Sequence, residues 1–197
     1  TDHRLLLEEG QIDARIWAPP RLFFVETPSA LAVDLGCAYT LTVDSLGMSL
    51  LHVTSGYVEL VRDDRETLVP AGAMCMARPG HGPGTAFDQK ASAQLREALI
   101  RYDFENGGAA ALTDILAEVR ATDGITLWQL LFIADEYDRA RIYDRLVELI
   151  PPPEGVTRDG VLRNNPDMLD QWQRHLGLAV MSWKGYLKNK KTAFLGE

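Results

Sequence analysis

The stretch LAVDLGCAYTLTV, residues 31–43, decides the fold of the first half of the chain. Its odd positions, from Leu31 to Val43, are apolar or amphipathic, and its even positions are small or polar. A period of two is the pattern of a half-buried β-strand, whose successive side chains point to opposite faces. Cys37 is one of the apolar positions, so we expect its thiol to point into a core and not to act as a surface nucleophile.

Similar short segments precede and follow this stretch, with glycine and proline between them. Segments of this length and spacing are typical of an antiparallel sandwich or rolled sheet. In the segment LLHVTSGYVELV the apolar phase changes at Gly56, which predicts a bulge or corner there. Gly36 offers a place where a strand could bend into a second sheet. The expected strand segments are 11–17, 21–27, 31–43, 50–61 and 66–77.

The composition changes at RPGHGPGTAF, residues 78–87, where three glycines and two prolines occur in ten residues. Beyond this segment the apolar residues recur at helical spacing. The sequence therefore predicts an α+β chain, with an antiparallel β-roll or sandwich over residues 1–88 and an all-helical domain over residues 89–197.

Several residues of the second half mark the ends of the expected helices. We expect Thr126, Asp135 and Asn165 to be N-caps, because their side-chain oxygens can accept hydrogen bonds from free backbone N–H groups. Gly177 is expected to end the helix that Asn165 begins. Tyr137 is expected on the broad apolar face of the helix that follows Asp135.

Charge and hydropathy exclude some function classes. The chain of 197 residues has a net charge of -8 and a pI near 5.0, which argues against a nucleic-acid surface. Its one basic cluster, residues 183–191, is interpreted as a solvated tail, with a membrane surface or an acidic partner as the alternative. No apolar run is long enough to span a membrane. The chain begins with Thr, so it was either processed or cut from something longer, and a targeting or anchoring segment could lie upstream.

Motifs for catalysis or metal binding are missing from the sequence. The four histidines occur singly, and no zinc-binding spacing, nucleophile motif or phosphate-binding loop is present. We therefore expect no enzymatic activity, no metal and no cofactor. Carboxylates such as Glu26, Asp34 and Asp44 could pair in a cleft, but acids on the polar face of a sheet are usually solvated. The histidines are His3, His52, His81 and His175.

The two cysteines, Cys37 and Cys75, both lie on expected strands. In an oxidising compartment they could form a disulfide, which would stabilise the fold by roughly 4 kcal/mol in the chain-entropy model. The alternative is a pair of buried free thiols that act as small hydrophobic side chains. The compartment decides between the two.

The tryptophans fall into two groups. Trp128, Trp172 and Trp183 occur at helical spacing with leucines and are expected to pack within or between helices. Trp17 instead follows a strand and precedes two prolines. Its indole could stack on a sugar or a peptide, or it could cover the edge of the β core.

The β half resembles the FecR domain. The resemblance rests on a TPSA turn at residues 27–30 before a long alternating strand, a V-x-x-G-x-V strand at residues 53–58, and an L-x-x-G turn near residues 69–72. It covers about residues 8–80. The usual RGTEF stretch of that domain is replaced here by DLGCAYTL.

The helical half resembles an extension that some FecR-domain proteins carry. The matching segments read ITLWQLL, IYDRL, PPP and VTRDGVL, and we know no chemistry for this extension. They lie at residues 125–131, 142–146, 151–153 and 156–162.

The resemblance implies a regulator with a protein partner, either a signalling receptor or a sigma-factor system. Proteins of this family typically hold a sigma-regulating segment in the cytoplasm, cross the membrane once and present this domain in the periplasm. That location favours a disulfide between Cys37 and Cys75. A carbohydrate- or peptide-binding envelope module that uses Trp17 is the alternative, and an enzyme with paired carboxylates beside a pocket is the third hypothesis.

Overall fold

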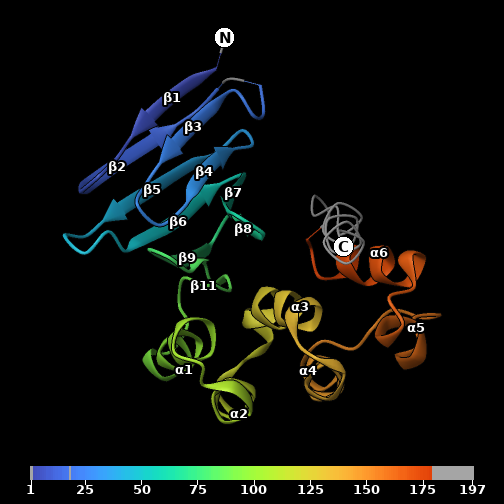
Figure 1. The fold of residues 1–197 in the computed structure, drawn as a ribbon. Helices are drawn as coiled ribbons and strands as arrows, with labels where there is room; N and C mark the ends of the chain where they lie inside the picture. Colours follow the sequence, from blue (N-terminus) through green and yellow to red (C-terminus); the bar gives the residue numbers. More distant parts are fainter. Residues whose placement is uncertain (1, 18, 179–197) are drawn as a thin grey trace, which may run out of the picture. The chain divides into compact units, whose positions relative to one another are not determined.

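The structure is a computed structural model that describes residues 2–17 and 19–178. The chain, drawn as a ribbon in Figure 1, divides into two compact units, Thr1–Gln129 and Leu130–Glu197. The first unit holds every strand of the described chain, together with α1, α2 and the start of α3. No helix among the described residues is both long enough and apolar enough to cross a membrane.

Short strands fill the first part of the chain and helices the second, which confirms the predicted α+β class. The strands are β1 (His3–Leu6), β2 (Gly10–Arg15), β3 (Phe23–Glu26), β4 (Leu31–Asp34), β5 (Ala38–Val43), β6 (Ser49–Ser55), β7 (Tyr57–Arg62), β8 (Arg65–Pro70), β9 (Ala73–Arg78), β10 (Gly82–Pro83) and β11 (Phe87–Asp88). The helices are α1 (Ala93–Phe104), α2 (Gly108–Glu118), the 3-10 turn η1 (Ala121–Asp123), α3 (Gly124–Ile133), α4 (Glu136–Leu149), α5 (Arg158–Leu162) and α6 (Pro166–His175).

The strands form two sheets whose inner faces make one core. One sheet has the order β1-β3-β4-β7-β8, and the other has the order β10-β9-β6-β5-β2, with β11 also paired to β9. All neighbouring strands are antiparallel except β1 and β3, which run parallel. Fully buried side chains such as Val25 and Leu60 of the first sheet and Leu41 and Leu51 of the second fill the space between them.

The chain changes sheet at the two glycines that the sequence indicated. It leaves β4 for β5 at Gly36 and leaves β6 for β7 at Gly56, and both residues have positive φ values, +87° and +70°. Residues 31–43 are therefore two strands in different sheets, and the side of the chain that faces the core changes at the corner. Asp34, expected on the polar face, points to the core side of β4 and is 1% exposed.

The TPSA turn joins the two sheets through hydroxyl groups. Thr27 Oγ1 accepts hydrogen bonds from the backbone N–H groups of Ser29 and Ala30, at 3.3 and 3.0 Å. The Ser29 hydroxyl, which is buried, bonds to the hydroxyl of Ser49 on β6. Small hydroxyl side chains at these positions satisfy one another where the turn is closed from water.

The strands end at Asp88 and the first helix begins at Ala93, whereas the compact units divide within α3. The domain boundary at residues 88 and 89 stays a prediction. Asp103 and Gln129 are among the side chains that tie the helices of the first unit to the β part. Asp103 of α1 accepts the Thr85 backbone N–H at 2.7 Å and the Thr85 hydroxyl at 3.0 Å. Gln129 of α3 accepts the Ala86 N–H and donates to the Leu68 carbonyl, both at 2.7 Å.

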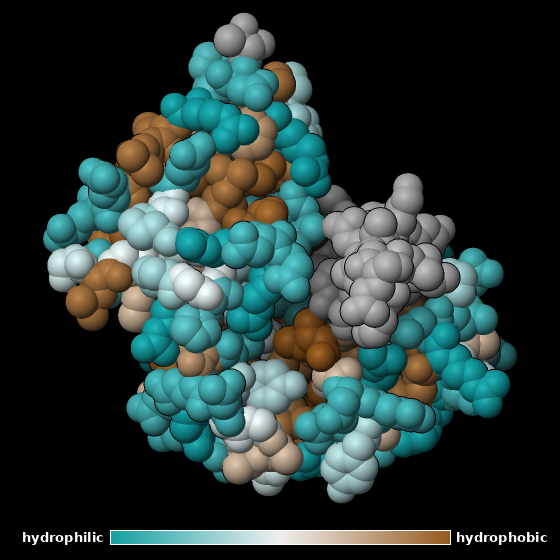
Figure 2. All heavy atoms as spheres, in the orientation of Figure 1, coloured by the Kyte–Doolittle hydropathy of each residue, from teal (hydrophilic) through white to brown (hydrophobic). Residues whose placement is uncertain are grey.

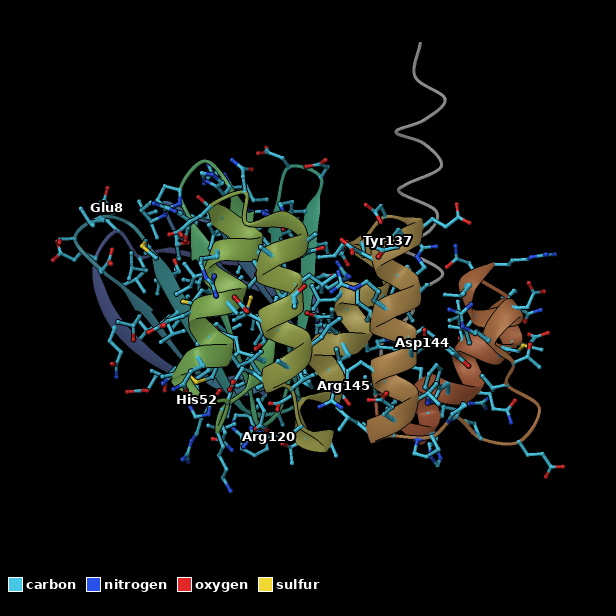
Figure 3. All side chains as sticks on the ribbon, turned by 90° about the horizontal axis from the view of Figure 1, so that it is seen from below. Glu8, His52, Arg120, Tyr137, Asp144 and Arg145 are labelled. Carbon is cyan, nitrogen blue, oxygen red and sulfur yellow. The ribbon has the colours of Figure 1, made fainter. Side chains whose placement is uncertain are left out.

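Some of the helix ends predicted from the sequence are found in the structure and one is not. Asp135 and Asn165 are N-caps, as predicted, whereas Thr126 lies inside α3, where its hydroxyl donates to the Ala86 carbonyl at 2.9 Å. Gly177 follows the last described helix with a φ of +73°. Tyr137 is 75% exposed, because it lies on the solvent side of the first turn of α4 (Figure 3).

Of the three tryptophans expected to pack among helices, the structure describes Trp128 and Trp172. Trp128 and Trp172 are buried, as expected. In the second unit, Tyr143 packs edge-on against Trp172 with ring centroids 5.5 Å apart, and Asp144 beside it pairs with Arg158 at 3.1 Å. Trp183 and the basic segment 183–191 lie outside the described residues.

Candidate binding surface

The loop between β2 and β3 presents the most exposed tryptophan of the described chain. Trp17 is 95% exposed and follows β2, in which Ile12 and Ala14 face the core and Gln11 and Asp13 face solvent. Its indole does not cover the edge of the β core, which was the other expectation. A fully exposed indole offers a flat apolar ring with one N–H donor, a surface suited to stacking against a sugar or a peptide side chain.

Arg21 anchors this loop to the sheet below it. Its backbone has a φ of +64°, a left-handed conformation that brings the chain back toward β4. The Arg21 N–H donates to the Asp34 carbonyl at 2.8 Å, and its guanidinium lies 2.9 Å from the Glu59 carboxylate. At Arg21 the loop that carries Trp17 is thus held by both a backbone hydrogen bond and an ion pair.

Glu59 is the partner that receives Arg21, and it is a buried acid. It lies in β7 between the core-facing Val58 and Leu60, so its side chain points to the outer face of the sheet, where it is only 5% exposed. Burial and, to a smaller extent, the nearby Glu66 carboxyl raise the pKa of Glu59, Arg21 lowers it, and the net result is a pKa of about 7. Glu59 and Glu66 are the paired carboxylates that an enzyme hypothesis would require.

A second buried acid holds the corner beside the loop. Asp34 accepts the Gly36 N–H at 2.7 Å with one carboxylate oxygen and the Cys37 thiol with the other. Burial, the hydrogen bond to Asp34 and the Asp34 charge all raise the pKa of Cys37. Burial also raises the pKa of Tyr39, which shares this cluster. Cys37 is therefore a thiol that donates a hydrogen bond and fixes the corner.

Cys75 lies elsewhere in the same sheet and is also a free thiol. It donates to the Gly84 carbonyl at 3.3 Å and is fully buried. The register aligns Cys75 with Leu51 and Leu51 with Leu41, so Cys75 and Cys37 are two strands and four residues apart. This amounts to about 10 Å across and 13 Å along the sheet, beyond the roughly 7 Å that a disulfide spans. The structure therefore holds two buried free thiols and no disulfide between them.

The surface around the β strands is mixed in character. Figure 2 shows hydrophobic side chains among polar ones over the strands of the first unit. The exposed large hydrophobic residues of this unit are Leu5, Leu6, Trp17, Leu46 and Leu50. Leu5 and Leu6 belong to β1, at the border of one sheet, and Trp17 follows β2, at the border of the other.

Sequence reasoning found Trp17 and the cysteines but missed Arg21 and Glu59. The YVELV segment, residues 57–61, held a signal for Glu59, because a single acid within an apolar run indicates a partnered carboxylate. The sequence held no signal for Arg21, because nothing in the residue order indicates that an arginine adopts a positive φ.

Part of this chain is similar to two solved structures. No protein-family model matches the chain, and no curated protein matches it. Two solved structures, at 1.65 and 2.50 Å, are each described as "a putative anti-sigma factor" from Parabacteroides distasonis ATCC 8503. They share 19% and 20% identity over 50% and 51% of this chain and 47% and 48% of theirs, with TM-scores of 0.34 and 0.35. The chain spans about half the length of these proteins, and a similarity this partial defines neither its fold nor its function.

Proposed function

We propose that this chain is the non-catalytic, extracytoplasmic signalling part of a membrane-anchored sigma-factor regulator of the FecR type. The observation that carries the proposal is the position of the motifs that resemble the FecR domain. The TPSA turn supplies the buried hydroxyl network around Thr27, and the glycine of the V-x-x-G-x-V strand is the sheet-crossing Gly56. The glycine of the L-x-x-G turn, Gly72, has a φ of +83° and donates its N–H to the Val53 carbonyl.

A signalling role needs a contact surface more than a reaction centre. The anchored loop with Trp17 provides an exposed aromatic side chain at a fixed place, which suits a protein partner. The paired carboxylates Glu59 and Glu66 support an enzyme less well, because Glu59 is 5% exposed and is held by Arg21.

The proposal is tested in the cells that carry the gene. Deletion of the gene is expected to change the transcription of one sigma-dependent set of genes. Protease added to spheroplasts is expected to digest this part of the full-length protein while cytoplasmic markers stay intact. Unchanged transcription together with a protease-resistant chain would contradict the proposal.

The exposure of Trp17 supports a second candidate, a carbohydrate- or peptide-binding envelope module without a sigma factor. In that case a glycan or peptide array incubated with the chain would give ligands whose binding is lost in Trp17→Ala. Tyr137→Ala, which removes another exposed aromatic side chain, is the matched control. Equal binding by Trp17→Ala and the wild type would exclude this candidate.

A further inference from the structure

The β2 strand leaves one border of its sheet open. Ile16 donates its N–H to the Cys37 carbonyl at 3.0 Å, so in this antiparallel pair the alternate residues Ile12 and Ala14 also turn their backbone polar groups toward β5. Gln11, Asp13 and Arg15 turn theirs the other way, where the sheet has no further strand. Figure 1 shows β2 with a neighbouring strand of its own sheet on one side.

The other borders of the two sheets are shorter or already occupied. The Leu68 carbonyl of β8 accepts the side chain of Gln129, and β9 is covered by β10 and β11. β1 has four residues, and its Arg4 is paired with Glu26 at 2.9 Å. β2 has six residues and contains no proline or lysine, the residues that commonly protect an open edge.

The sequence of β2 is complementary to itself when two copies pair antiparallel. If Ala14 faces Ala14 of the second copy, Asp13 faces Arg15 of the second copy, and the same ion pair forms a second time across the two-fold axis. Ile12 then faces Ile16 of the second copy on the core side. Registers shifted by two residues place Asp13 opposite itself or Arg15 opposite itself, and like charges directly opposite each other are destabilising.

The side chains of β2 and of Ile16 are exposed or half-buried, so they are accessible to a second copy of the strand. Asp13 and Arg15 are exposed, and no ion pair of Arg15 is found among the residues that the structure describes. Ile12, Ala14 and Ile16 are half-buried, so an added strand would complete their burial. Trp17, at 95% exposure, would come to lie beside Gln11 of the second copy.

We propose that a second copy of this chain pairs antiparallel with β2, in the register that sets Asp13 against Arg15 of the second copy, and that the two sheets become one continuous sheet. The interface is a single strand pair with few side chains, so the dimer is weak and depends on protein concentration. This inference goes beyond the signalling role and does not depend on it, because it concerns the purified chain alone.

Sedimentation velocity over a range of micromolar concentrations tests the pairing through charge reversal. Asp13→Arg and Arg15→Asp are each expected to raise the dimer dissociation constant at least about tenfold, because like charges then face each other. An equimolar mixture of the two variants is expected to dimerise again, since every pair in the mixed dimer carries opposite charges. Arg96→Glu and Glu97→Arg, on the exposed face of α1, are the matched controls and should dimerise like the wild type.

A cross-linking measurement keeps the test independent of folding effects at Asp13, whose carboxylate accepts the Thr40 hydroxyl at 2.6 Å. Ala14→Cys lies on the proposed two-fold axis, so mild oxidation is expected to give a covalent dimer on a non-reducing gel. Thr42→Cys, on the neighbouring β5, should not. A wild type that stays monomeric at every concentration, a mixture that fails to dimerise, or equal cross-linking of both cysteine variants would overturn the proposal.

Discussion

Gly56 lies against the carbonyl of Gly36 so closely that a Cβ atom at residue 56 would be 2.1 Å from that oxygen. The two glycines are the corners at which the chain passes from one sheet to the other, so their contact fixes how the sheets are joined. Any side chain at residue 56 would force the corners apart.

Replacing Gly56 by alanine is therefore expected to destabilise the chain strongly. The variant combines a φ of +70° with the clash, and we expect a loss of at least about 3 kcal/mol in the free energy of unfolding. Urea denaturation followed by circular dichroism measures it. Gly36→Ala is the matched control, because it has a φ of +87° but open space around a Cβ, and it should cost about 1 kcal/mol. Equal losses would mean that the clash is relieved by a small shift.

Asp103 holds α1 to the loop before β11, and its replacement by asparagine should weaken that junction. The carboxylate accepts two hydrogen bonds from Thr85, whereas an amide offers one oxygen and brings an N–H₂ group toward a donor. We expect a loss of about 2 kcal/mol in the free energy of unfolding. Asp114→Asn, which removes an exposed pair with Arg101, should cost less than about 1 kcal/mol. A similar loss in both variants would argue against a special role for Asp103.

Glu59 makes stability depend on pH. Its pKa is raised from 4.5 to about 7, so between these values the folded chain binds more protons than the unfolded chain. The contribution of Glu59 to the free energy of unfolding is therefore fully present below about pH 4.5 and is lost as the pH rises to about 7, by an amount on the order of 3 kcal/mol. Thermal unfolding at a series of pH values checks this, and Glu59→Gln should flatten the profile. A fall of the same size in Glu59→Gln would assign it to another group.

The thiols of Cys37 and Cys75 are expected to be free and protected. Both are buried and both have a raised pKa, with burial as the main cause, so little reactive thiolate forms at neutral pH. Iodoacetamide should modify neither cysteine in the folded chain and both after denaturation, as read by intact mass. Two missing modifications after denaturation without reductant would reveal a disulfide and contradict the register of β5, β6 and β9.

Local patterns predicted much of this fold because they are physical requirements of one strand or one helix end. Gly56 was found from a change of apolar phase, and Asp135 and Asn165 were found from capping chemistry. Asp34 was misjudged, since the alternation continues through Gly36 although the core-facing side of the chain does not. A corner between two sheets is a tertiary feature, and the two-residue alternation of apolar and polar side chains does not reveal it.

The candidate site was predictable only in part for a similar reason. Trp17 stood out beside two prolines, but its exposure depends on how the loop leaves β2. Arg21 reaches Glu59 from another part of the chain, 38 residues away in sequence, and such pairs form only when the sheet brings them together. Tyr137 shows the same limit on a helix, because the apolar face of α4 begins one turn later than the sequence suggested.

The most direct test of the proposed function is the capture of partners by the full-length protein from its own cells. A tagged copy expressed at its natural level is purified after mild cross-linking, and the bound proteins are identified by mass spectrometry. A sigma factor enriched with the full-length protein, and lost when the segment upstream of this chain is removed, is the result that the proposal predicts. A full-length protein that is recovered intact without any sigma factor, under conditions where another regulator of the same cells retains its own, would contradict it.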